Sequence, residues 1–211
     1  VMEKLVPLMA LLYVGGCLVI IFANITALPG AFKTIFVMAF DPQSAGGGAL
    51  GITVREAMRY GVARGLFSNE AGMGSTPHAH ALAKVDHPDD KGMMAMMGVF
   101  IDTFVVLTCT ALVIVITGVW NCGSTGTELA QIAFDTVFGS FGNIYIAVCL
   151  FFFAFSTIIG WYFFGEANVK ALFGAKYVKI YAAVVVVFIV IGSGLKVNLV
   201  WNMSDMFNGL M

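Results

Sequence analysis

Charged residues are scarce in this chain: 11 lysines and arginines and 12 aspartates and glutamates make up 11% of its 211 residues. Such a low fraction excludes an ordinary water-exposed domain, in which about a quarter of the residues are charged. The formal net charge of −1 provides no basic surface, so we expect no nucleic-acid partner. Hydrophobic residues make up 60% and the mean hydropathy is +0.93, which is typical of a protein that crosses the membrane several times.

Cysteine and histidine are also sparse. The four cysteines are scattered, three of them within apolar runs, which favours small buried hydrophobic residues over a disulfide or metal framework (Cys17, Cys109, Cys122 and Cys149). His78, His80 and His87 lie close together in sequence, with Asp86 beside them. However, His78 and His80 are spaced so that they do not share a helical face, and no four-ligand set with zinc-like spacing is present. We therefore expect no metal site and no cofactor.

One polar stretch interrupts the apolar sequence. Residues 65–77 read Gly-Leu-Phe-Ser-Asn-Glu-Ala-Gly-Met-Gly-Ser-Thr-Pro, with three glycines and one ionisable side chain. In a bilayer, an unwound backbone is tolerated only where protein or a wet cavity satisfies its polar groups. The composition therefore predicts a discontinuous helix over about residues 52–85 that lines a binding site. Thr76 before Pro77 is typical of an N-cap and first helical position, so a second half-helix is expected to start there.

The two half-helix ends are expected to carry opposite partial charges. Bare N–H groups at the start of the second half attract an anion, and bare carbonyls at the end of the first attract a cation. A site that faces both ends suits a zwitterion such as an amino acid, or a carboxylate together with a metal cation. The alternative is a re-entrant loop or a buried kink without a ligand, and the residues alone leave it open.

These residues also carry a family resemblance. The chain resembles the alanine or glycine:cation symporter family, within the amino acid-polyamine-organocation superfamily, over nearly its whole length; the matching motifs are the run 65–75, Ala79-His80-Ala81, His87-Pro88 and Gly98-Val99-Phe100-Ile101-Asp102-Thr103. The resemblance implies an all-α, leucine-transporter-type fold of two inverted five-helix repeats, each with a broken first helix. It also implies import of L-alanine, D-alanine or glycine with sodium, or with a proton, by a multi-pass protein of the cell inner (plasma) membrane.

The hydropathy pattern indicates a single transmembrane domain over residues 1–211, and the resemblance implies that it is a transporter domain, incomplete in this chain. Besides the broken helix, the segments long enough to cross the lipid bilayer lie at about 5–27, 93–120, 141–164 and 178–195, and a further helix starts at about 198. Residues 31–40 are too short to cross and are expected at the interface. A charged loop at 86–92 is expected to end the broken helix.

Residues 121–140 have a mixed composition that predicts a short amphipathic helix on the membrane surface. One helical face would carry Leu129, Ile132, Ala133, Thr136 and Val137. Because the inverted-repeat fold needs an earlier broken helix, we interpret the chain as a fragment that holds the last helix of the first repeat and most of the second. The missing N-terminal half of the same polypeptide would supply the other ligands, so this piece alone is expected not to transport.

The predicted substrate site lies in the break. Phe67 is expected to crowd the substrate, since a pocket that admits alanine but not leucine must reject by bulk. Ser68, Asn69 and the backbone around residues 72–75 can donate to a carboxylate or accept from an amine. Glu70 either binds the amine or the ion, or holds the half-helices together, and we favour the scaffold role. The predicted residues are Phe67, Ser68, Asn69, Glu70, Gly72, Met73, Gly74, Ser75 and, from a later span, Trp161.

Three polar residues in later spans complete the prediction. By resemblance to the leucine-transporter-type fold, Ser156 and Thr157 fall where the eighth helix helps to hold a sodium ion, and Trp161, one turn on, would form an apolar wall. Alternatively, these hydroxyls bond back to their own helix and Trp161 only packs. Asp102 is an acid near the membrane midplane and hence a candidate functional residue, unless it forms a structural pair with Arg64.

A second class of function competes with transport, namely an integral membrane enzyme or a channel that uses Glu70 and Asp102. An enzyme needs a nucleophile with a base in reach, and no such grouping is apparent at one membrane depth. A channel needs a repeated ring or filter sequence, which is absent from the sequence. The residues therefore favour a transporter and not an enzyme.

Overall fold

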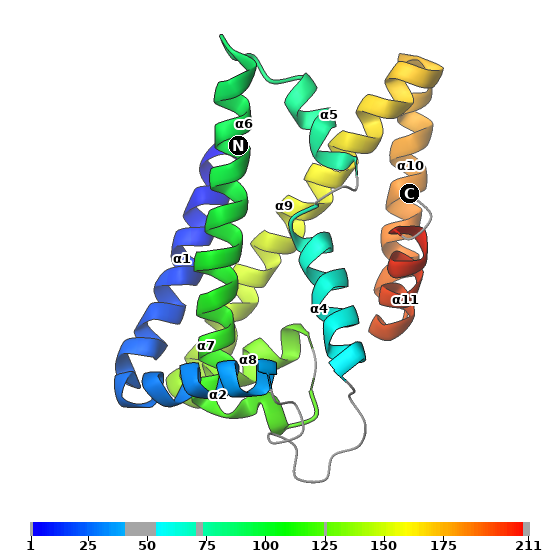
Figure 1. Cartoon of the computed structure of the whole chain (residues 1–211). Helices are drawn as coiled ribbons and strands as arrows, with labels where there is room; N and C mark the ends of the chain where they lie inside the picture. The colour runs from blue at the N-terminus through cyan, green and yellow to red at the C-terminus, as the bar shows by residue number, and fades with distance from the viewer. Residues whose placement is uncertain (1, 41–53, 71–73, 125, 209–211) are drawn as a thin grey trace. The chain divides into compact units, whose positions relative to one another are not determined.

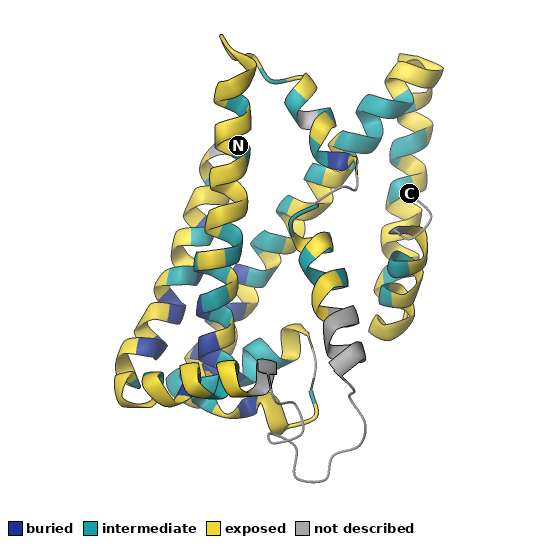
Figure 2. Cartoon of the chain, viewed as in Figure 1, coloured by how far each residue is buried: buried dark blue, intermediate teal, exposed yellow. Residues whose placement is uncertain are grey.

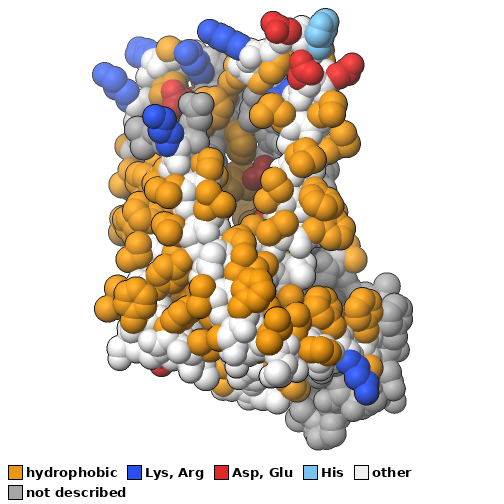
Figure 3. Space-filling model, turned by 90° about the vertical axis from the view of Figure 1, so that its left-hand side faces the viewer, with side chains coloured by type: hydrophobic (Ala, Val, Ile, Leu, Met, Phe, Trp, Pro, Cys, Tyr) orange, Lys and Arg blue, Asp and Glu red, His pale blue; other side chains and the backbone are white. Residues whose placement is uncertain are grey.

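The computed structural model describes residues 2–40, 54–70, 74–124 and 126–208, and within them the secondary structure is helical, with no strand. Four helices in these ranges are long and apolar enough to cross a membrane: Lys4–Ala23, Pro88–Thr117, Ser140–Phe173 and Ala175–Ser193. The expectation of an all-α membrane protein is therefore confirmed at this level. The space-filling view in Figure 3 shows hydrophobic side chains over much of the face it presents, as expected for a surface in contact with lipid.

The chain divides into two compact units. The first comprises Val1–Met58 and Met93–Ser156, and the second comprises Arg59–Gly92 and Thr157–Met211. Helix α4 (Val54–Ser68) and helix α9 (Ser140–Phe173) each begin in the first unit and end in the second. The candidate site residues of the break and Trp161 belong to the second unit.

The first unit is built around α7 (Thr108–Thr117), which contacts α1 (Met2–Ala23), α2 (Leu28–Phe40) and α8 (Thr127–Phe138). Figure 1 shows α2 running crosswise to α1 and α7. The core of this unit is apolar, and its largest fully buried side chains are Cys17, Ile20, Val113, Phe134 and Ile146. Figure 2 shows the buried residues of the chain in dark blue. The hydroxyls of Tyr13 and Thr110 lie 2.8 Å apart and join α1 to α7 by a hydrogen bond.

The helical segment that includes α7 is irregular in its middle, which the sequence did not predict. It begins as α6 (Pro88–Phe100), continues as the π-helical segment η2 (Ile101–Leu107) and ends as α7. The expected span at 93–120 is therefore present but shifted toward the N-terminus. The expected charged loop at 86–92 is wrong in part, because Pro88 starts α6 and Asp89 and Asp90 fall in its first turn, where proline and acidic side chains are favourable.

The short helix expected within 121–140 is α8, and its buried face differs slightly from the prediction. Ala133 is fully buried as expected, but Thr136 is exposed and the buried aromatic side chain is Phe134. The buried face therefore centres on residues 133 and 134, which pack in the core of the first unit.

The second unit contains the rest of α4, the short helix α5 (Ser75–Ala81), the later part of α9, α10 (Val178–Ser193) and α11 (Val197–Asn208). Helix α5 ends at Ala81, so the expected extension to residue 85 is wrong. The expected end of the 141–164 span is also wrong, because α9 continues to Phe173. Helix α9 continues through Gly165 because a single glycine destabilises a helix by only about 1 kcal/mol. The absence of a side chain at Gly165 also leaves room for the Tyr181 hydroxyl.

Candidate substrate site

Helical structure is interrupted inside the stretch that the sequence singles out. Helix α4 ends at Ser68, Asn69 and Glu70 form a turn, and α5 begins at Ser75. Gly72 and Met73, two of the predicted site residues, lie outside the described residues. The described flanks of the interruption are tied to each other by side chains, as follows.

The carboxylate of Glu70 joins the two flanks. Its Oε2 accepts a hydrogen bond from the Ser75 hydroxyl at 2.7 Å and a longer one from the Thr76 hydroxyl at 3.4 Å. Ser75 is buried, with 7% of its surface exposed. The backbone φ of Glu70 is +51°, a left-handed conformation that few residues other than glycine adopt. The hydrogen bonds from Ser75 and Thr76 to Glu70 are consistent with the scaffold role predicted for this residue.

The start of α5 differs from the prediction. The N-cap is Gly74, with φ of +76°, and not Thr76, so Pro77 occupies the third helical position instead of the first. The physical reason is that the hydroxyls of Ser75 and Thr76 donate to Glu70, and no side chain caps the helix. Proline is still tolerated there, since the first-turn N–H groups have no intrahelical partner.

Asn69 closes the end of α4. Its backbone N–H and its side-chain amide both donate to the carbonyl of Gly65, each at 3.2 Å. The Gly65 carbonyl is one of the last of the helix, so Asn69 satisfies an acceptor that has no partner within a regular helix. Ser68, the last residue of α4, is exposed.

Phe67 lies against α11. Its ring makes an edge contact with Trp201, with centroids 5.3 Å apart, and the Arg64 guanidinium stacks over the same indole at 3.9 Å from its centroid. Arg64 also forms a bidentate ion pair with Asp205, at 2.9 and 3.3 Å. The charge of Arg64 is thus balanced within its own unit by Asp205.

A cavity of about 370 Å³ connects the start of α5 to α9 and α10. It brings two predicted residues of the break, Gly74 and Ser75, together with the predicted Trp161. The other lining residues are His78, Phe164, Gly165, Asn168 and Tyr181. Trp161 is 38% exposed, so its indole is available to a ligand in this cavity.

Two lining residues, His78 and Asn168, were not predicted as site residues. The Asn168 side-chain nitrogen lies 3.3 Å from His78 Nε2 and donates to the Phe164 carbonyl at 2.9 Å. The spacing offered a signal, because His78 follows Ser75 by three residues and Asn168 follows Trp161 by seven, which puts each pair on one helical face. That signal needed the knowledge that α5 and α9 are neighbours.

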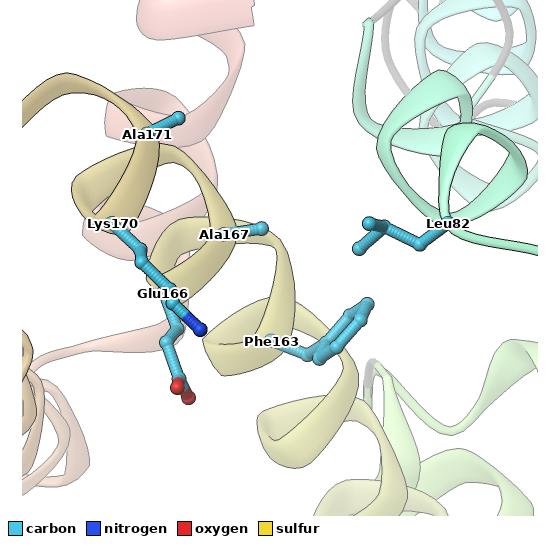
Figure 4. Close-up of a pocket in the computed structure, with 6 residues that line it drawn as sticks. All are labelled: Leu82, Phe163, Glu166, Ala167, Lys170 and Ala171. Carbon is cyan, nitrogen blue, oxygen red and sulfur yellow. The ribbon is translucent and has the colours of Figure 1, made fainter. Parts of the chain in front are cut away.

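A neighbouring hollow of about 380 Å³ lies farther along α9. Figure 4 shows Leu82 and Phe163 extending toward each other across it, with Ala167 on the same side of α9. Glu166, Lys170 and Ala171 complete the lining. Although Glu166 and Lys170 give this hollow charged lining residues, it contains none of the predicted site residues, so it is a weaker candidate for the substrate site.

Ser156, Thr157 and Asp102 lie away from the break in sequence. The Ser156 hydroxyl donates to the Phe153 carbonyl at 2.9 Å, which is the back-bonding considered from the sequence. Thr157 follows on α9 and is exposed. Asp102 lies in the π-helical segment η2, a type of helical irregularity that is frequent at functional sites. Within the described ranges, no group of three or more potential metal ligands is present.

Comparison with known proteins identifies the chain's relatives. It is 45% identical to an uncharacterized transporter of Haemophilus influenzae, covering 98% of this chain and 46% of the relative. It is 40% identical to the probable sodium/glutamine symporter GlnT of Bacillus subtilis (99% and 43%). It is 41% identical to the sodium/alanine symporter AgcS of Methanococcus maripaludis (98% and 46%).

The chain therefore spans a little under half the length of these relatives. The model of the sodium:alanine symporter family matches residues 1–211, in agreement with the resemblance found in the sequence, and this family is one of transporters, not of enzymes. The chain belongs to the sodium:alanine symporter family.

Proposed function

We propose that this protein is a secondary active symporter that imports a small neutral amino acid, namely alanine, D-alanine or glycine, together with sodium or a proton across the plasma membrane. The observation that carries the proposal is the interrupted helix: α4 and α5 flank a polar break, and Trp161 faces the start of α5 across one cavity. The family match and the relative named as a sodium/alanine symporter support the same function.

The physical basis is the opposite polarity of the two half-helices. The carbonyl end of α4 favours the amine of the substrate or the accompanying cation, and the N–H end of α5 favours the carboxylate. Trp161, which lines the cavity, would cover the small side chain. Phe67 is not among the residues that line this cavity, and its role in limiting the size of the substrate is carried over from the sequence-based prediction. Glu70 would be a scaffold residue, because its carboxylate is already engaged by Ser75 and Thr76.

The sodium site would include Ser156 and Thr157 on α9. Sodium prefers hard oxygen ligands, and a hydroxyl that donates its hydrogen to a carbonyl, as Ser156 does to Phe153, keeps lone pairs with which to coordinate a cation. Back-bonding and ion binding are therefore compatible at this residue.

The proposed fold is the leucine-transporter-type inverted repeat. Helix α1 would be the last helix of the first repeat, and α4 with α5 would be the broken first helix of the second. An enzyme or channel that uses Glu70 and Asp102 is less well supported, since the described interactions of Glu70 serve to join the two half-helices.

The test is uptake of labelled alanine into proteoliposomes that contain the protein produced from its whole reading frame. We expect saturable accumulation of unmodified alanine that requires an inward sodium or proton gradient. Competition with glycine, D-alanine and glutamine would rank the substrates, glutamine being included because one relative is named as its symporter. Gradient-independent turnover to a modified product would overturn the proposal in favour of an enzyme.

A further inference from the structure

Four side chains of α4 and α11 form one cluster beside the break. Arg64 and Phe67 come from the last turns of α4, three residues apart, and Trp201 and Asp205 come from α11, four residues apart. Each pair therefore lies on one face of its helix. The contacts are the bidentate ion pair of Arg64 with Asp205, the stacking of Arg64 on Trp201, and the edge contact of Trp201 with Phe67.

Trp201 is the centre of this cluster, since it touches both residues of α4. Its indole makes an edge contact with the Phe67 ring, and the Arg64 guanidinium lies over the face of the indole in a cation–π contact. Asp205 fixes the orientation of that guanidinium through two parallel hydrogen bonds, a geometry that lysine or asparagine cannot reproduce in full. The position of Phe67 therefore depends on two residues of another helix.

Helix α4 ends one residue after Phe67, so there is little structure of its own to hold this ring. The next residues turn away through Asn69 and the left-handed Glu70. Trp201 therefore provides a contact from outside α4 that restrains the Phe67 ring.

We propose that Trp201 and Asp205 are positioning residues that set the size limit of the substrate site by holding Phe67 and the end of α4. This inference rests on the proposed function, and in particular on the predicted role of Phe67, whose ring packs on Trp201 and does not line the cavity beside Trp161. Neither residue touches the substrate in this scheme. Trp201 restrains the Phe67 ring directly, and Asp205 acts one step farther away by aligning Arg64 against Trp201.

The test compares how well amino acids of increasing side-chain size compete with labelled alanine: alanine itself, 2-aminobutyrate, valine and leucine. We expect Trp201→Ala to reduce the ratio of the affinities for alanine and for the next larger amino acids by about tenfold. This is the discrimination that one methylene group typically produces in an apolar pocket. Trp201→Phe keeps an aromatic contact for Phe67 and should retain most of the discrimination. Asp205→Asn should lie between the two, and Met206→Ala, an exposed position on α11, is the matched control.

A double mutant separates positioning from general damage. If Trp201 acts through Phe67, then Phe67→Ala with Trp201→Ala should discriminate no worse than Phe67→Ala alone, because the effects of coupled residues do not add. A merely structural role for Trp201 would instead lower the uptake of all substrates by one common factor and leave the competition ratios unchanged. That result, in variants that elute as folded protein on size-exclusion chromatography, would overturn the inference.

The outcome also separates this inference from the proposed function. If the unmodified protein shows no gradient-driven alanine uptake, the proposed function fails and the inference fails with it. If the unmodified protein takes up alanine, but the competition ratios measured for Trp201→Ala and Asp205→Asn match those of Met206→Ala, only the inference fails.

Discussion

The Ser75 hydroxyl donates a hydrogen bond of 2.7 Å to the Glu70 carboxylate, and this bond joins the turn after α4 to the first residue of α5. Ser75 is buried, so the bond is shielded from water and should contribute more than a surface contact. The bond engages the one acidic side chain of the break, and it makes the role of Glu70 open to experiment.

Replacing Ser75 by alanine should destabilise the protein by about 1–3 kcal/mol, the range for losing a hydrogen bond to a charged group. Glu70→Gln should cost less, because the amide oxygen can still accept from Ser75. Thermal unfolding in detergent measures both effects, and alanine binding to the same samples distinguishes the roles of Glu70. Binding retained in Glu70→Gln fits a scaffold; binding abolished in a well-folded variant would make Glu70 a ligand.

Gly74 adopts a φ of +76°, so an alanine there should cost about 1–2 kcal/mol through backbone strain alone. The added Cβ meets no atom within 4 Å, which removes steric overlap as an explanation. The matched control is Gly61→Ala on α4, which also has open space and should be neutral or stabilising, since alanine favours a helix. Equal melting temperatures for the two variants would contradict the left-handed cap.

Gly165 allows α9 and α10 to approach closely, because a Cβ at this position would overlap the Tyr181 hydroxyl. Gly165→Ala should therefore destabilise the protein by about 1–3 kcal/mol and deform the cavity that Trp161 shares with Tyr181. Gly160→Ala, on the same helix but with open space, is the control. Thermal unfolding and alanine affinity report the two effects. Rescue of Gly165→Ala by Tyr181→Leu is expected, and its absence would argue against this contact.

If Ser156 coordinates sodium as proposed, Ser156→Ala should raise the sodium concentration for half-maximal alanine uptake by about tenfold or more, because the variant would lack one of the oxygen ligands of the proposed site. Ser193→Ala is a close control, because Ser193 makes the same kind of bond to a carbonyl three residues earlier, at 2.7 Å to Val190. Uptake at varied sodium with fixed alanine measures the change. If both variants behave alike, Ser156 serves only its own helix.

Several features of this protein were evident in the sequence because they depend on local chemistry. The long apolar runs that become α1 and α10 are long enough to cross a bilayer whatever their neighbours. The glycine-rich polar stretch between Phe67 and Pro77 cannot continue a regular helix, and helical structure is indeed interrupted there. The longest of the family motifs, residues 65–75, overlaps this stretch, and with the motifs that follow it the resemblance pointed to a symporter.

Contacts between distant segments were decided by the tertiary structure alone. The sequence suggested Asp102 as a possible partner of Arg64, and only the packing of α11 on α4 shows the ion pair with Asp205, 141 residues away. Likewise, threonine is a residue type that favours the N-cap position, so the sequence predicted Thr76 there. In the structure the hydroxyls of Thr76 and Ser75 donate hydrogen bonds to the Glu70 carboxylate, and Gly74 is the N-cap of α5. Local propensities differ by a few tenths of a kcal/mol to about 1 kcal/mol, and one shielded contact with a charged group is enough to outweigh them.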